Sequence, residues 1–106
     1  MKTIIIYKKS NGTEPINLWI NALKDIYARA KIRRKIERIE EGNYGNHRYL
    51  QGAIFELKID CGPGYRVYCG EEDKKIIVLL CAGNKRSQSK DIKLAVEYWT
   101  DYLKRK

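Results

Sequence analysis

The sequence predicts an α+β fold in which a mostly antiparallel, twisted sheet packs against helices on one of its faces. Three observations support this prediction: apolar residues recur at helical spacing through residues 16–39, alternate with polar residues through residues 55–69, and return to helical spacing from residue 92. The chain has 106 residues, 43% of them hydrophobic, which is enough for one core. We therefore expect a single domain over residues 1–106, with the element order strand, helix, helix, four strands and helix.

The N-terminal half predicts one strand followed by two helices. Residues 3–7 are β-branched and apolar, as in a strand packed on both faces. A polar break at residues 10–12 separates this strand from a helix with Pro15 in its first turn, where the missing N–H costs nothing. The apolar residues that mark the two helices are Ile16, Trp19, Ile20, Leu23, Ala28, Ile32, Ile36 and Ile39. Gly42 predicts the C-terminal cap of the second helix.

The C-terminal half predicts four strands and a closing helix. A short strand is expected around residues 48–50, followed by a hairpin over residues 54–69 in which apolar and polar residues alternate. The apolar run within residues 75–82 indicates a central strand. A polar loop over residues 83–89 then leads to an amphipathic helix marked by Ile92, Ala95, Val96, Trp99 and Leu103.

The hairpin loop is predicted to comprise Gly62, Pro63 and Gly64. This loop places Cys61 opposite Tyr65, and the apolar rows of the two strands then share one face. The same register gives two further pairs, Asp60 with Arg66 and Lys58 with Tyr68. The opposite face is expected to be polar and uncovered, and to carry Lys58, Arg66 and Tyr68.

Positive charge is the strongest signal in the composition. Lys and Arg total 22 against 13 Asp and Glu, so the formal net charge is +9. Such an excess favours polyanionic partners. No apolar run approaches the roughly 20 residues of a membrane-spanning helix, and the N-terminus lacks a signal-peptide core. We therefore expect a cytoplasmic protein with no membrane partner.

The cysteine and histidine content does not predict a metal site. Cys61, Cys69 and Cys81 have no short paired spacing, and His47 is the one histidine. This set is neither a zinc signature nor a complete disulfide framework, so we expect buried thiols, no metal and no cofactor. A lone loop histidine such as His47 is more often incidental than catalytic.

Several cations of the C-terminal half suit the chemistry of RNA cleavage. Without a metal, this reaction requires a base for the 2′-hydroxyl, cations that stabilise the phosphorane, and a proton for the leaving 5′-oxygen. Arg66 offers a planar fork that suits phosphate oxygens, and Lys58 is a candidate phosphate contact or base. Lys85 and Arg86 lie in the loop before the last helix. The alternative stays open that Arg66 only pairs with Asp60 across the hairpin and that Lys58 is only solvated.

Other residues are candidates for contacts with the rest of an RNA strand. Tyr68 on an exposed sheet suits stacking on a base, with packing as the alternative. The second helix is dense in Lys and Arg, which suits contact with a nucleic-acid backbone or a solvated face. The candidate RNA-binding residues are Tyr68, Arg86, Arg33, Arg34 and Arg38.

Two segments of the C-terminal half follow a known pattern. They are residues 54–68, IFELKIDCGPGYRVY, and residues 79–92, LLCAGNKRSQSKDI. They resemble the phage-derived addiction-module killer proteins, the HigB-like branch of the RelE/ParE superfamily. That family shows Glu-Leu-Arg on a strand, then Gly-Pro-Gly-Tyr-Arg-Val-Tyr, and later Leu-Leu-x-Gly-Gly-Asp-Lys-x-x-Gln-x-x-Asp-Ile.

The resemblance implies a RelE-like fold, a toxin encoded beside a neutralising antitoxin, and cleavage of messenger RNA, in many relatives on the ribosome. The family's cationic positions fall on Lys58, Arg66 and Lys85. Ala82 and Asn84 stand where the family has Gly and Asp. Many relatives carry a Tyr or His near the C-terminus, whereas Tyr98 and Tyr102 lie inside the predicted helix, so the general acid stays unassigned.

Two hypotheses of function follow. In the first, the protein is the toxin of a type II toxin–antitoxin module and a metal-independent endoribonuclease, with Arg66 and Lys85 holding the phosphate and Lys58 as candidate base. Its partners are then messenger RNA, the ribosome and a cognate antitoxin. In the second, it is a binding protein without nuclease chemistry, either a gyrase-directed toxin of the ParE type or an RNA-binding remnant. Three cations on one polar face favour the first hypothesis, and the incomplete acid–base set favours the second.

Overall fold

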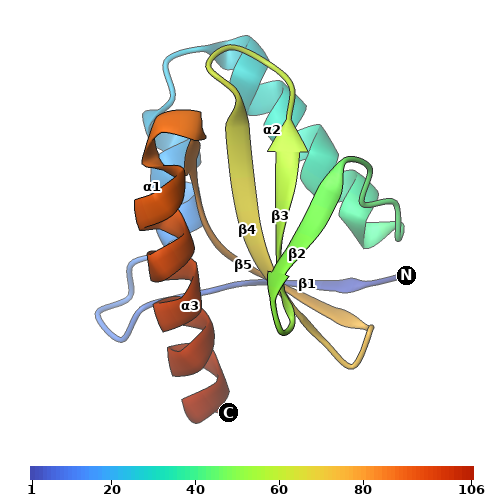
Figure 1. Cartoon of the computed structure of the whole chain (residues 1–106), viewed down its shortest axis with the longest axis vertical. Helices are drawn as coiled ribbons and strands as arrows, with labels where there is room; N and C mark the ends of the chain where they lie inside the picture. Colours follow the sequence, from blue (N-terminus) through green and yellow to red (C-terminus); the bar gives the residue numbers. More distant parts are fainter.

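A five-stranded sheet with helices against it forms the core of the computed structural model, which describes residues 1–106 (Figure 1). In chain order the elements are β1 (Thr3–Ile6), α1 (Pro15–Ala22), α2 (Ile26–Glu40), β2 (His47–Gln51), β3 (Ile54–Ile59), β4 (Tyr65–Glu72), β5 (Ile76–Asn84), the 3₁₀ helix η1 (Lys85–Ser87) and α3 (Gln88–Lys104). The strands lie in the order β1-β5-β4-β3-β2, with β1 parallel to β5 and the other neighbours antiparallel. The predicted fold class and element order are confirmed.

The boundaries of α1 and α2 follow from local chemistry. Pro15 occupies the start of α1, where no intrahelical N–H bond is lost. The Asp25 side chain caps α2 by accepting hydrogen bonds from the N–H groups of Tyr27 and Ala28, at 3.0 and 3.2 Å. Gly42 follows the end of α2 with a φ of +90°, as a glycine after a helix C-terminus commonly does.

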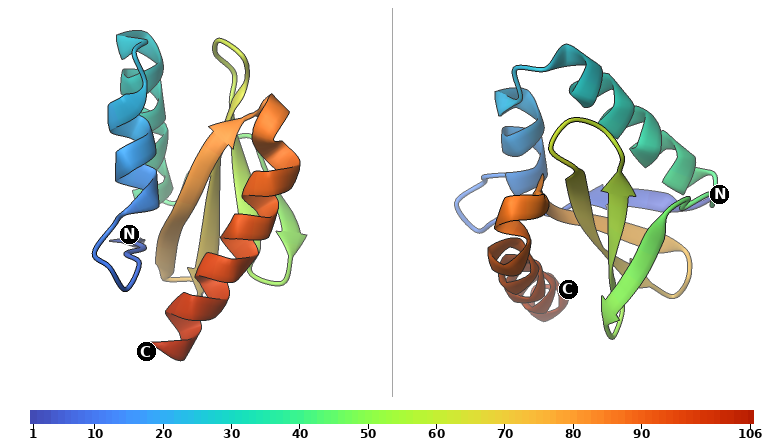
Figure 2. Two further views of the ribbon diagram at one scale, coloured as in Figure 1. Left: turned by 90° about the vertical axis from the view of Figure 1, so that its left-hand side faces the viewer. Right: turned by 45° about the horizontal axis from the view of Figure 1, so that its top comes forward.

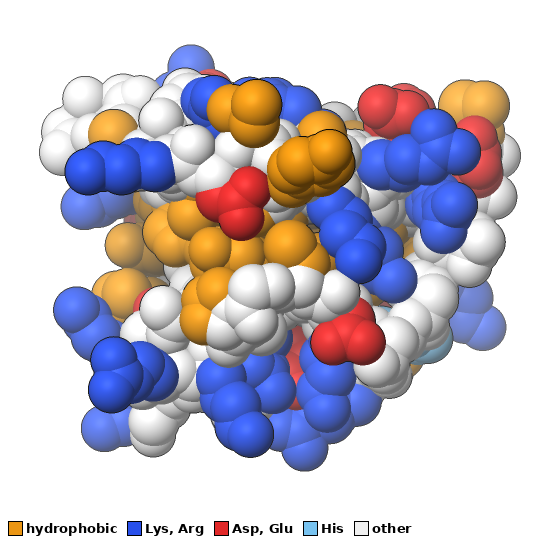
Figure 3. All heavy atoms as spheres, turned by 90° about the horizontal axis from the view of Figure 1, so that it is seen from above, with side chains coloured by type: hydrophobic (Ala, Val, Ile, Leu, Met, Phe, Trp, Pro, Cys, Tyr) orange, Lys and Arg blue, Asp and Glu red, His pale blue; other side chains and the backbone are white.

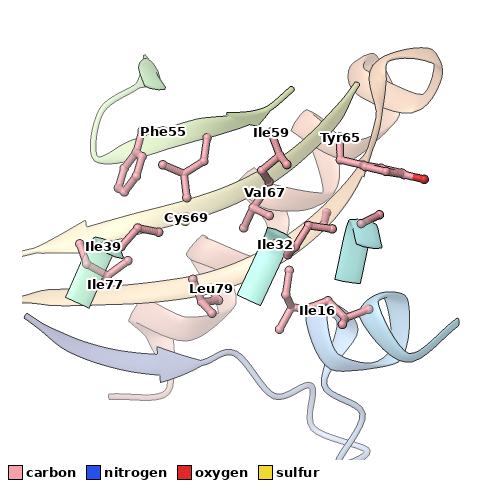
Figure 4. Close-up of a cluster of buried hydrophobic side chains, with 14 residues drawn as sticks. Ile16, Ile32, Ile39, Phe55, Ile59, Tyr65, Val67, Cys69, Ile77 and Leu79 are labelled. Atoms are coloured by element: carbon pink, nitrogen blue, oxygen red, sulfur yellow. The ribbon is translucent and has the colours of Figure 1, made fainter. Parts of the chain in front are cut away.

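One face of the sheet packs against α1 and α2. The apolar residues of β3 and β4 that were predicted to share a face meet the isoleucines of the two helices there, in a closed cluster (Figure 4). Its fully buried members include Phe55, Leu57, Val67, Ile16 and Ile32. Burial of this stripe accounts for the helical period in the sequence.

The prediction that all helices lie on one face is wrong, because α3 covers the opposite face (Figure 2). A bulge in β5 explains why that face is apolar: Tyr68 pairs with Cys81, but Cys69 pairs with Leu79, so Leu80 is the extra residue. Leu80 and Cys81 therefore both contribute to the cluster under α3. An unbroken apolar run cannot reveal which of its residues is the extra one.

The predicted hairpin register is also wrong, by two residues. Ile59 pairs with Tyr65 and Lys58 with Arg66, so the loop comprises residues 60–64 and not the three residues Gly62, Pro63 and Gly64 alone. Because the shift is even, every side chain keeps its predicted face. The shift brings Lys58 directly opposite Arg66.

The segment after β5 is more regular than the predicted polar loop. β5 continues to Asn84, whose side chain accepts hydrogen bonds from the N–H groups of Arg86 and Ser87 at the start of η1, and α3 follows at Gln88. None of the helices is long and apolar enough to cross a membrane.

Candidate nucleic-acid-binding site

Lys58, Arg66 and Lys85 lie at the same end of the sheet, on three different elements. Lys58 of β3 pairs directly with Arg66 of β4. Gly64 lies beside the other two cations: a Cβ on Gly64 would stand 3.9 Å from Nη1 of Arg66 and 4.0 Å from Cβ of Lys85. The structure therefore brings the predicted cations together around the β3–β4 hairpin.

Lys58 is accessible because β2 does not extend alongside it. The β2–β3 ladder begins with His47 opposite Leu57, and the N–H of Lys58 donates to the carbonyl oxygen of Asn46 at 2.9 Å, outside that ladder. Beside this point lies a hollow of about 210 Å³. Its lining comprises Asn46, Lys58, Ile59, Asp60, Gly64, Tyr65 and Arg66. Lys58 and Arg66 thus share one solvent-open hollow.

A second hollow of about 420 Å³ continues from the first toward α2. Five cations line it, namely Lys31, Arg34, Lys35, Arg38 and Lys58. Its one acidic residue is Asp60, whose carbonyl oxygen accepts a hydrogen bond from Nζ of Lys31 at 2.8 Å. The two hollows share Asn46, Lys58, Ile59 and Asp60, and we call the continuous surface the cationic groove. Figure 3 looks down on this end of the molecule, where Lys and Arg side chains outnumber the acidic ones.

A buried carboxylate, that of Glu56, lies behind Arg66. The Glu56 side chain is 0% exposed. Its Oε2 accepts a hydrogen bond from Nε of Arg48 at 2.7 Å, and its Oε1 accepts one from Nε2 of Gln88 at 3.1 Å. Nε of Arg66 lies 3.8 Å from Oε1, an ion pair but not a hydrogen bond. The alternative pairing of Arg66 with Asp60 is absent, since the observed register moves Asp60 into the loop.

Tyr68 does not lie where base stacking requires it. Its side chain is fully buried, in the cluster under α3, and its hydroxyl has no hydrogen-bond partner. Burial, and after it the negative charge of Glu56, raises the pKa of Tyr68 well above its ordinary value. The packing alternative therefore holds for Tyr68, because α3 covers the face that was expected to be open.

The arginines predicted to contact RNA separate into two groups. Arg34 and Arg38 line the cationic groove, and Arg86 is exposed in η1, next to Lys85. Arg33 points elsewhere: its Nη2 lies 3.4 Å from Oδ1 of Asn21 in α1, and it lines an apolar hollow beside β1. A helix turns by about 100° per residue, so neighbouring arginines face different surroundings.

His47 and the C-terminal tyrosines lie outside the lining of the cationic groove. His47 is exposed, with Nδ1 2.9 Å from the carbonyl oxygen of Gly45, and its ring lies edge-on to aromatic neighbours in β2 and β3. Tyr98 stacks on Tyr7, and the hydroxyl of Tyr102 donates to Glu72, the last residue of β4. Arg66 is the second residue of β4, so Tyr102 lies at the opposite end of that strand from Arg66.

Several residues of this region were not singled out from the sequence: Lys31, Lys35, Asn46, Arg48, Glu56 and Gln88. The charge density of α2 indicated the lysines as a group. Glu56 alternates with apolar neighbours and predicts a wet position, so nothing in the pattern marks it as buried. No three His, Cys, Asp or Glu side chains gather into a group able to hold a metal ion.

The arrangement suits the binding of a phosphodiester chain. Arg66 and Lys58 line the hairpin end of the groove, Lys85 lies beside it next to Gly64, and the α2 cations extend from it as a track. Lys and Arg that neutralise successive phosphates supply most of the affinity in contacts with a nucleic-acid backbone.

Comparison with known proteins gives one informative relative. No family model matches the chain. An uncharacterized protein of Haemophilus influenzae (strain ATCC 51907 / DSM 11121 / KW20 / Rd) is 46% identical over 77 residues, which cover 73% of this chain and 78% of that protein. At this identity and coverage the two proteins share a common fold and ancestry. The chain belongs to the same protein family as this Haemophilus influenzae protein.

Proposed function

We propose that the protein is the toxin of a type II toxin–antitoxin module and a metal-independent endoribonuclease that cleaves messenger RNA on the ribosome. The observation that carries this proposal is that Lys58 and Arg66 line one solvent-open end of the cationic groove, with Lys85 beside it next to Gly64. The resemblance of residues 54–68 and 79–92 to the addiction-module killer proteins supports it independently. A cytoplasmic location and a cognate antitoxin belong to the same proposal.

The cleavage step uses the RNA's own 2′-hydroxyl. Its oxygen attacks the adjacent phosphorus while the bond to the 5′-oxygen breaks, which leaves a 2′,3′-cyclic phosphate and a 5′-hydroxyl. Arg66 and Lys85 stabilise the negative charge that develops on the phosphorane oxygens. Lys58 is the candidate base for the 2′-hydroxyl proton, and the 5′-oxygen takes a proton from water as it leaves.

The α2 side of the groove then holds RNA beyond the scissile bond. Lys31, Arg34, Lys35 and Arg38 lie on one side of α2 and line the larger hollow. Contacts of this kind do not depend on base sequence. They suit either the flanking messenger or the backbone of ribosomal RNA, so the groove provides affinity and the hairpin end provides the chemistry.

The test combines induction of the protein in a bacterium with mapping of transcript ends. The wild type is expected to arrest growth and to produce new ends within translated frames. Arg66→Ala is expected to lower cleavage by about 10²–10³-fold, because it removes a charge that stabilises the transition state. Lys75→Ala, in the turn between β4 and β5, is the control and should cleave as the wild type does. Persistent cleavage by folded Arg66→Ala would remove Arg66 from the mechanism.

A second candidate function rests on the composition of the smaller hollow. No histidine lines it, and its one carboxylate is that of Asp60, so it lacks the usual proton-transfer groups. A binding protein of the ParE type, directed at gyrase, needs cations but no acid–base pair. Intact transcripts together with DNA damage on induction would favour this candidate over the nuclease.

A further inference from the structure

The carboxylate of Glu56 holds two arginines by the same atom of each. Its Oε2 accepts from Nε of Arg48, and its Oε1 faces Nε of Arg66. An arginine held at Nε keeps its two terminal nitrogens free, and those nitrogens form the fork that binds phosphate. Glu56 thus accepts a hydrogen bond from Nε of Arg48 and lies in ion-pair range of Nε of Arg66, and neither contact uses a terminal nitrogen.

Because Glu56 is buried, the fold requires cations and hydrogen-bond donors around its carboxylate. A carboxylate that is 0% exposed is costly unless cations and hydrogen-bond donors surround it. Arg48 lies directly opposite Glu56 in the β2–β3 register, Arg66 comes from β4, and Gln88 adds a donor from the first residue of α3. Four elements meet at one carboxylate, so its position is fixed before any ligand arrives.

The two arginines differ in exposure: Arg48 is open to solvent, whereas the Arg66 side chain is 11% exposed and lines the smaller hollow. The Arg48 side chain is 58% exposed, and its one hydrogen bond is the one from Nε to Glu56. Nη1 of Arg66 makes a long hydrogen bond of 3.4 Å to the carbonyl oxygen of Gly64, beside Lys85. A fork that is already ordered loses little conformational entropy when it binds phosphate.

We propose that Arg48 binds the phosphate next to the one held by Arg66, and that Glu56 is the positioning residue of both arginines. The ligand class is the backbone of single-stranded RNA with at least two consecutive phosphates. This inference rests on the proposed function, to which it adds a phosphate contact on β2. It places the strand across β2 and β4, in addition to the path along α2.

The first experiment measures binding without cleavage. The probe is a short single-stranded RNA with 2′-O-methyl groups, which cannot supply the attacking hydroxyl, and its affinity is followed by fluorescence anisotropy over a series of salt concentrations. Arg48→Gln is expected to bind about tenfold more weakly and to lower the slope of log affinity against log salt by about 0.7, the value for one single-strand phosphate contact. Lys75→Gln, with the same change of charge, should match the wild type.

Two further variants separate positioning from net charge. Arg48→Lys keeps the charge but lacks a fork held at Nε, so it should bind nearly as weakly as Arg48→Gln. Glu56→Gln removes a negative charge, which by electrostatics alone would tighten RNA binding, whereas loss of positioning should weaken it several-fold. Circular dichroism and a melting curve check that each variant is folded. If Glu56→Gln fails to fold, Arg48→Lys decides the question.

The outcomes separate this inference from the proposed function. Wild-type affinity for Arg48→Gln, or tighter binding by folded Glu56→Gln, overturns the inference. If the wild type binds the methylated strand but produces no new transcript ends on induction, the nuclease assignment fails and the Arg48 result still decides the second phosphate contact. A wild type that does not bind the methylated strand overturns the inference, and transcript-end mapping still decides the proposed function.

Discussion

Glu56 and Glu71 are two carboxylates on neighbouring strands whose surroundings differ in one instructive respect. Glu71 in β4 accepts hydrogen bonds from the hydroxyls of Tyr44 and Tyr49, both at 2.5 Å, and lies 3.7 Å from Nζ of Lys2. Tyr44, Tyr49 and Lys2 each direct the polar end of the side chain at Glu71. Glu56 has Gln88 and two arginines as partners, and the arginines face it by Nε and not by their terminal nitrogens.

On the proposed function, the difference separates a structural contact from one that serves ligand binding. The Glu71 contacts join the segment after α2, β2 and the N-terminus to β4. The Glu56 contacts leave two buried polar atoms, Nε of Arg66 and the hydroxyl of Tyr68, without hydrogen bonds. Buried polar atoms of native proteins are mostly hydrogen-bonded, so the Glu56 surroundings differ in this respect from those of Glu71.

The largest expected effect comes from adding a side chain at Gly83 of β5, which pairs with Arg66 of β4. A Cβ on Gly83 would lie 1.8 Å from Oδ2 of Asp91 and 2.5 Å from Oγ of Ser87, so Gly83→Ala must displace the start of α3. We expect a loss of about 3 kcal/mol in the free energy of unfolding, measured by urea denaturation, as for other overpacked sites. Ser89→Ala, at an exposed position of α3, is the control. A loss below about 1 kcal/mol would show that α3 adjusts freely.

The next effect tests the hydrogen bond from Tyr44 to Glu71. Tyr44→Phe removes a hydrogen bond to a charged acceptor and should lower the free energy of unfolding by about 1–2 kcal/mol. RNA cleavage per folded molecule should stay at the wild-type level, in contrast to Arg66→Ala. Tyr27→Phe, at an exposed tyrosine without a side-chain hydrogen bond, provides the matched control. Reduced cleavage by folded Tyr44→Phe would show that the contacts of Glu71, like those proposed for Glu56, serve cleavage.

A smaller effect depends on pH. Burial raises the pKa of Glu71, but the hydrogen bonds from Tyr44 and Tyr49 and the charge of Lys2 outweigh it, so the net pKa is lowered. The stabilisation is therefore present above the unfolded-state pKa of about 4.3 and is lost as pH falls through the lower folded-state value. The difference in unfolding free energy between the wild type and Glu71→Gln should shrink from pH 7 to pH 3. For Glu97→Gln, at an exposed residue, the difference should stay small at both pH values.

The smallest expected effect concerns Tyr68. Its hydroxyl is buried without a partner, so Tyr68→Phe should change stability by less than about 1 kcal/mol, or increase it, unlike Tyr44→Phe. Cleavage should be unchanged, because the side chain lies under α3. A loss of stability as large as that of Tyr44→Phe would mean that the hydroxyl has a partner.

Much of the fold could be predicted because local periodicity reports burial. The helical spacing of Ile16, Ile20 and Ile32 and the alternation of Leu57 with Lys58 are direct records of which side chains face the core. The convergence of Lys58 with Arg66 also followed, since neighbouring strands of a hairpin bring such residues together whichever even register they adopt.

The sequence alone determined the α+β class, the order of its elements and the excess of cations near the β3–β4 hairpin, because each depends on residues close together in the chain. The tertiary structure decided the side on which α3 packs, the burial of Tyr68 and Glu56, and the meeting of Arg48, Arg66 and Gln88 at one carboxylate. These features join residues far apart in sequence, and their energies depend on packing and desolvation that no local pattern records.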